Sequence, residues 1–215
     1  SPQLVVEFEP ALYDAVIAAL PLPPGSDVRV IFGDARTVAD AALPNEKPLP
    51  VPSSAPPGLD DAATVRTATD TDWVDASFTV VDLWDAAVIR HRVASQEFYR
   101  RVAARSAAAG VVAVNLLDGH PFDYSRRQAA TLSTVFDHVA VVLDAEPEDA
   151  EGPLGNVVIF ASDDPLDAVM TSVLLDTPRP QVLHGVRLTS WIAEARIMTD
   201  ADVADSPDPD DPIWD

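Results

Sequence analysis

The stretch FTVVDLWD, residues 78–85, joins an apolar run to two carboxylates that stand three positions apart. Val80 and Val81 carry the β-branched side chains that favour a strand. Asp82 and Asp85 follow at the strand's end, where a carboxylate beside buried apolar surface is costly unless it has a partner. The stretch therefore predicts a strand whose carboxyl end carries polar chemistry.

Other apolar runs on both sides of this strand alternate with helical patterns. The predicted strands are residues 3–9, 27–35, 75–83, 111–117, 138–144 and 156–162. The predicted helices are residues 11–20, 95–109 and roughly 124–136, the second of them stopped by Gly110, and a further helix opens at Asp164 and Pro165. We expect the last two strands to pair at one edge. This alternation indicates an α/β fold with a doubly wound, mostly parallel sheet.

The length of 215 residues favours one domain, which we place at residues 1–204. Residues 36–74 read as an inserted surface loop without regular structure, because prolines are frequent between Pro44 and Pro57. Residues 205–215 alternate Pro and Asp and are expected to form an acidic, disordered tail.

The formal net charge of -21 argues against nucleic acid as a partner, since phosphate binding needs clustered basic side chains. The same charge permits a cationic ligand, but general solubility is the favoured explanation of it. No apolar run is long enough to span a bilayer and no signal peptide is recognisable, so we expect a cytoplasmic protein without a membrane partner. The chain has no cysteine, and its four histidines lack paired metal spacing, so we predict no metal site.

Acidic residues close four of the predicted strands. They are Glu7, Glu9, Asp34, Asp82, Asp85 and Asp118. Each of them alone is more often a cap or turn residue than a functional one. Acids at the same end of successive parallel strands nevertheless converge on the crevice where ligands of such sheets bind.

The order of short motifs resembles the spermidine synthase (polyamine aminopropyltransferase) family. The motifs that carry the resemblance are VVEFEPAL (5–12), GDAR (33–36), VVDLWD (80–85), QEFYRRV (96–102) and VVAVNLL (111–117). The resemblance implies a Rossmann-like, methyltransferase-type fold that binds decarboxylated S-adenosylmethionine as co-substrate. It also implies transfer of an aminopropyl group to a small-molecule amine or polyamine, and it leaves a homodimer open.

The resemblance also assigns roles to four of the acids. Glu7 stands where the family holds the ribose hydroxyls, and Asp34 where it has the acid beside the adenine. Asp82 stands at the catalytic base, and Asp85 at the second acid of the D-x-x-D motif, which helps to hold the amine.

The sequence also departs from the family. The family's first strand and Gly-rich turn have no counterpart here, so we expect further sequence upstream. The segment after Asp85 lacks the usual proline, and NLLDGHPF (115–122) replaces the expected glutamine and tryptophan. An S-adenosylmethionine-dependent methyltransferase and a non-catalytic scaffold of the same fold therefore remain as alternatives.

Overall fold

The computed structural model describes residues 2–43, 66–67, 69, 72–143, 155–173, 180–202 and 204–208. These residues form two compact units, Ser1–Val74 and Asp75–Asp215. The single domain over residues 1–204 stays a prediction, and the two units are treated separately below.

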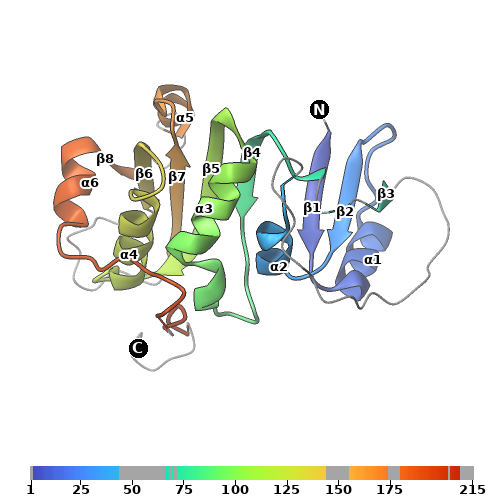
Figure 1. Cartoon of the computed structure of the whole chain (residues 1–215), viewed down its shortest axis with the longest axis horizontal. Helices are drawn as coiled ribbons and strands as arrows, with labels where there is room; N and C mark the ends of the chain where they lie inside the picture. Colours follow the sequence, from blue (N-terminus) through green and yellow to red (C-terminus); the bar gives the residue numbers. More distant parts are fainter. Residues whose placement is uncertain are drawn as a thin grey trace. The chain divides into compact units, whose positions relative to one another are not determined.

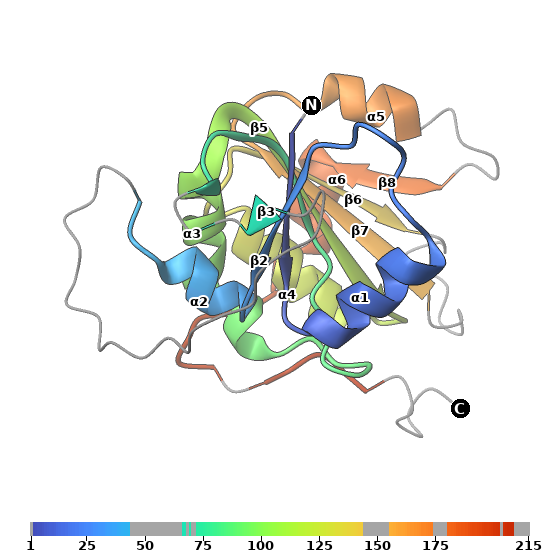
Figure 2. The same cartoon turned by 90° about the vertical axis from the view of Figure 1, so that its right-hand side faces the viewer.

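The first unit is a small parallel sheet with a helix on each face. Strand β1 (Gln3–Glu7) pairs with β2 (Val28–Phe32), which pairs with the short β3 (Arg66–Thr67). Helix α1 (Pro10–Ala19) connects β1 to β2, and α2 (Ala35–Asp40) follows β2. Figure 2 shows α1 and α2 on opposite sides of these strands, which is the doubly wound arrangement. The core of the unit lies under α2, where Val38 packs with Ile31.

Helix α2 corrects the expected start of the Pro-rich insertion. Residues 36–40 are helical rather than irregular, because Asp34 caps the helix by accepting a hydrogen bond from Thr37 N. Residues 44–65 of the insertion lie outside the described residues, and Arg66–Thr67 form the short strand β3 rather than irregular chain.

The second unit contains a five-stranded sheet in the order β4-β5-β7-β6-β8. Its strands are β4 (Ala76–Val81), β5 (Ser106–Asp118), β6 (His138–Leu143), β7 (Gly155–Ser162) and β8 (Gln181–His184). Strands β4 and β5 are parallel, whereas β7 runs antiparallel to both β5 and β6, and β8 antiparallel to β6. The predicted pairing of the last two strands is confirmed, but β8, which the sequence reading missed, takes the edge position.

Helices cover this sheet and connect its strands. They are α3 (Gln96–Arg105), α4 (Asp123–Leu132), α5 (Asp167–Val173) and α6 (Gly185–Trp191), with a 3-10 turn at His91–Val93. Helices α3 and α4 lie on one face (Figure 1), where Tyr99 Oη donates a hydrogen bond of 2.6 Å to Gln128 Oε1. Both side chains are buried, so this bond fixes the two helices to each other.

Two predicted helix boundaries are wrong. Helix α3 ends at Arg105 rather than at Gly110, because the alanine-rich residues after it pair in β5 instead. A side chain at Gly110 would place its Cβ only 2.7 Å from Ala76 O, so the close approach of β4 explains this glycine. Helix α5 begins at Asp167, and Asp164 is therefore not its cap.

The architecture is an α/β, Rossmann-like fold of the methyltransferase type. The carboxyl ends of β1 and β2 carry Glu7 and Asp34, and the carboxyl end of β4 carries Asp82 and Asp85. Among the described helices, none is long and apolar enough to cross a membrane.

Candidate functional site

Asp82 is held at the carboxyl end of β4 by two donors. The pairing of Val81 with Val114 brings Asp82 beside Asn115 on the neighbouring strand. Asn115 Nδ2 donates to Asp82 Oδ1 at 3.0 Å, and Trp84 Nε1 donates to the same oxygen at 2.6 Å. Oδ2 makes no hydrogen bond to the described residues, and the side chain is exposed. The carboxylate is thus oriented through one oxygen and open at the other.

Asp85 lies in a tight turn just beyond Asp82. Its backbone exchanges hydrogen bonds with Val88 at 2.9 and 3.1 Å, and Ala86 takes a positive φ of 55° inside the turn. Arg90 Nε and Nη2 both contact Asp85 Oδ2 at 2.7 Å. The acid expected to hold the amine is therefore paired with a guanidinium of the chain itself.

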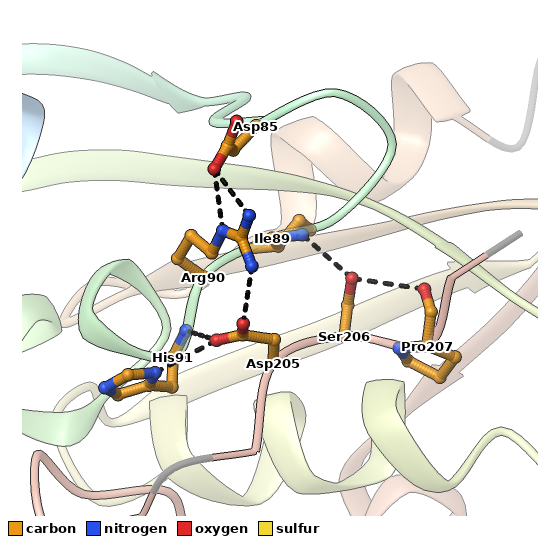
Figure 3. A network of polar contacts seen from close by, with 7 residues as sticks. All are labelled: Asp85, Ile89, Arg90, His91, Asp205, Ser206 and Pro207. Carbon is orange, nitrogen blue, oxygen red and sulfur yellow. Dashed lines mark hydrogen bonds and ion pairs between the residues drawn. The ribbon is translucent and has the colours of Figure 1, made fainter.

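The segment after Thr199 returns to this loop (Figure 3). Arg90 Nη1 donates to Asp205 Oδ2 at 2.9 Å, and His91 N donates to Asp205 Oδ1 at 2.7 Å. Ser206 N donates to Ile89 O at 2.9 Å, and Ile89 N donates back to Ser206 Oγ at 2.8 Å. Residues 205 and 206 are thus fixed to the loop, which corrects the expectation that the disordered tail begins at residue 205; residues 209–215 lie outside the described residues.

The charges in this network stabilise one another. Burial pushes the pKa of Asp205 upward, but hydrogen bonds from His91 and Arg90 outweigh it and hold that pKa below its ordinary value. Hydrogen bonds to Asp205 and Asp85 raise the pKa of the Arg90 guanidinium. The guanidinium therefore stays charged beside the ionised carboxylate of Asp205 at neutral pH.

Asp118, at the end of β5, has a structural environment. It is 1% exposed, and it accepts hydrogen bonds from Gly119 N at 2.9 Å and Ser125 N at 2.8 Å. Burial raises its pKa, and these hydrogen bonds oppose the rise. Because both oxygens bind the backbone that leads into α4, Asp118 anchors the start of that helix rather than facing a ligand.

The two acids of the first unit have local partners. Glu7 Oε1 accepts a hydrogen bond of 2.8 Å from Glu9 N. Asp34 Oδ1 accepts hydrogen bonds of 2.8 Å from both the backbone N and the hydroxyl of Thr37. Because Glu7 pairs with Phe32, the two acids stand at the ends of adjacent parallel strands. Their roles toward a nucleoside stay predictions.

Sequence reasoning missed Asn115, Arg90 and Asp205. Asn115 could have been found, because it directly follows the valine-rich residues 111–114 as Asp82 follows Val81, and neighbouring parallel strands bring such positions side by side. No sequence pattern pointed to Asp205 as a partner of Arg90, since it stands 115 residues further along the chain. Within the described ranges, no group of three or more potential metal ligands occurs.

Comparison with known proteins supports the fold through similar solved structures. No protein-family model matches the chain, and no curated protein sequence matches it. Among solved structures, a probable spermidine synthase from Corynebacterium glutamicum ATCC 13032 is similar with a TM-score of 0.69 and 18% identity, over 94% of this chain. At this identity the likeness shows the fold. The chain spans 64% of the length of that protein.

Two further structures are more distant. The spermidine synthase from Thermotoga maritima has a TM-score of 0.46 and 13% identity over 76% of this chain and 46% of its own. Human methyltransferase-like protein 13, in complex with SAH, has a TM-score of 0.48 and 15% identity over 92% of this chain and 74% of its own. Likenesses this loose do not allow site residues to be compared.

Proposed function

We propose that the protein is a spermidine synthase-like aminopropyltransferase. It would move an aminopropyl group from decarboxylated S-adenosylmethionine to an amine acceptor and release methylthioadenosine. The observation that supports this most is the environment of Asp82. This carboxylate lies at the carboxyl end of β4, with Oδ1 held by two donors and Oδ2 without a hydrogen bond to the described residues. The similar fold of a probable spermidine synthase supports it independently.

The chemistry requires a base of this kind. An alkyl amine with a pKa of about 10.4 is almost fully protonated at neutral pH and has no lone pair for attack. Asp82 Oδ2 would accept a proton from the acceptor nitrogen as that nitrogen forms a bond to the carbon beside the sulfonium. The carbon–sulfur bond breaks, and its electron pair neutralises the sulfur of the leaving methylthioadenosine. Asn115 and Trp84 would keep the carboxylate pointed in one direction during the transfer.

Glu7 and Asp34 would bind the nucleoside part of the co-substrate. Glu7 would accept hydrogen bonds from the ribose hydroxyls through Oε2, which makes no hydrogen bond to the described residues. Asp34 would contact the adenine while Oδ1 continues to cap α2. Asp85 would contribute less to amine binding than the resemblance implies, because Arg90 offsets its charge.

A methyltransferase that uses intact S-adenosylmethionine is the second candidate. The ion pair between Asp85 and Arg90 favours it, because a methyl acceptor does not need a second free carboxylate as a cation anchor. The two candidates differ in the co-substrate that they bind, since only the methyltransferase must accommodate the co-substrate's carboxylate.

Calorimetry separates these functions. The protein is titrated with decarboxylated S-adenosylmethionine, methylthioadenosine and S-adenosylmethionine under identical conditions. The proposal predicts that the first two bind more tightly than the third. Tighter binding of S-adenosylmethionine would favour the methyltransferase, and binding of none of the three would leave a non-catalytic scaffold.

A further inference from the structure

The guanidinium of Arg90 occupies a position between two carboxylates. It contacts Asp85 Oδ2 through two nitrogens at 2.7 Å and Asp205 Oδ2 through the third at 2.9 Å (Figure 3). All three guanidinium nitrogens are therefore engaged, and the planar fork matches the geometry that carboxylates prefer. An ammonium ion that approached Asp85 Oδ2 would therefore be repelled by this positive charge.

The far end of the chain keeps Arg90 in place. Asp205 bridges Arg90 and His91, and the neighbouring Ser206 exchanges two hydrogen bonds with the backbone of Ile89. Ser206 is 7% exposed, so these bonds are shielded from water. The backbone on both sides of the ion pair is thus fixed, which lowers the entropy cost of holding the long arginine side chain.

Asp82 and Asp85 consequently differ in how much of their negative charge is available to bind a cation. The partners of Asp82, Asn115 and Trp84, are neutral, so no cation among the described residues offsets the charge of this carboxylate. The partner of Asp85 is a cation that it shares with Asp205, so the charge of Asp85 is partly offset. Of the two acids that follow β4, only Asp82 lacks a cationic partner among the described residues.

We propose that Arg90, positioned by Asp205, makes the protein selective for acceptors with a single ammonium group over diamines. Asp82 satisfies one cationic nitrogen, and Arg90 occupies the carboxylate that a second nitrogen would use. This inference rests on the proposed function only where it calls the amine an acceptor. The selectivity itself is a difference in equilibrium binding between two amines.

The expected change in diamine affinity follows from the solvent exposure of the Asp85–Arg90 ion pair. The side chains of Arg90 and Asp85 are 49% and 63% exposed, so water and salt weaken the pair. An exposed ion pair changes a binding equilibrium by at most about fivefold. We therefore expect removal of the arginine charge to tighten binding of a diamine by about fivefold at low ionic strength.

The test measures binding of 1,4-diaminobutane and n-butylamine by calorimetry to wild type, Arg90→Gln and Arg100→Gln. Arg100 is exposed on α3, so its variant makes the same change in net charge away from the loop. We expect Arg90→Gln to bind the diamine about fivefold more tightly and butylamine less than twofold more tightly. Arg100→Gln is expected to change both by less than twofold. Equal changes in the two variants, or no gain in Arg90→Gln, would overturn the proposal.

A double variant identifies the carboxylate that is responsible for the gain in diamine affinity. Asp85→Asn combined with Arg90→Gln has the net charge of wild type and should return diamine affinity to the wild-type value. Retention of tight binding would mean that another carboxylate, such as Asp205, provides the affinity, which would also contradict the proposal. Melting curves verify that the variants fold. Arg90→Met keeps an unbranched side chain without the charge and tests the same prediction in a second variant.

These measurements need no turnover. Failure of aminopropyl transfer would appear in the nucleoside titrations and in the kinetics of Asp82 variants, whereas failure of the selectivity would appear only in the amine titrations.

Discussion

The acids of the first unit and those of the second meet very different partners. Glu7 and Asp34 bind residues two and three positions away in the sequence. Asp82 binds Asn115, 33 positions away, and Asp85 reaches through Arg90 to Asp205, a further 115 positions along the chain. A carboxylate at the carboxyl end of a strand therefore has a local partner in one region and belongs to a long-range network in the other.

The largest effect is expected at Asp82. Asp82→Asn keeps the shape of the side chain but removes the base, so turnover in the proposed reaction should fall by about 100-fold or more. Asp75→Asn is the matched control, because Asp75 is exposed at the opposite end of β4. Steady-state kinetics and melting temperatures of both variants provide the measurement. Equal turnover in the two variants would remove Asp82 from the chemistry.

The second effect concerns stability and its dependence on pH. Asp205→Ala removes charge-assisted hydrogen bonds to Arg90 and His91 and should lower the free energy of unfolding by about 2 kcal/mol at pH 7. Because the pKa of Asp205 is lower in the folded state than its ordinary value of 3.8, this stabilisation is complete above that value. It is lost as the pH falls further, through the folded-state pKa.

Denaturant unfolding of wild type and Asp205→Ala at several pH values checks this. The gap between the two proteins should be widest near pH 7 and should narrow below about pH 4. A gap that is constant over this range would show that the ionised carboxylate is not what fixes the segment.

The third effect is expected at Asn115. Asn115→Ala removes one of the two donors to Asp82 Oδ1 and should lower turnover by about tenfold, less than loss of the base itself. Asn115→Gln, which keeps the amide, should recover part of the rate if orientation of Asp82 is the cause. No difference between Asn115→Ala and wild type would assign the positioning of Asp82 to Trp84 alone.

The smallest effect is expected in the first unit. Asp34→Ala removes the cap of α2 and should lower the free energy of unfolding by about 1 kcal/mol, whereas Asp34→Asn should retain most of it. Thermal unfolding of the two variants measures the contribution of the cap to stability. Calorimetry with methylthioadenosine then measures any separate role, because a binding loss in Asp34→Asn with unchanged stability is expected only if the acid also contacts the adenine.

Local features of the fold were predictable from the sequence. The apolar run before Asp82 predicted β4, and the reading of a strand-end acid as a cap or turn residue fits Asp34, which caps α2. These features depend on residues within a few positions of one another, where propensity and capping decide the structure.

Features that depend on distant contacts were not predictable. The residues after Arg105 have helical propensity but form β5, because pairing with β4 outweighs the preference of alanine. Likewise, Pro and Asp in the last segment suggested disorder, yet Asp205 finds a cation and Ser206 finds the backbone of Ile89. The same limitation explains why Asp85 was assigned to an amine before its arginine partner was known.

The most direct test of the central claim identifies the products. The protein is incubated with an amine acceptor and either decarboxylated S-adenosylmethionine or S-adenosylmethionine, and the products are analysed by mass spectrometry. The account predicts methylthioadenosine and an aminopropylated amine from the decarboxylated co-substrate, with Asp82→Asn forming them at about a hundredth of the wild-type rate. A methylated product from S-adenosylmethionine, or equal aminopropyl transfer by wild type and Asp82→Asn, would contradict it.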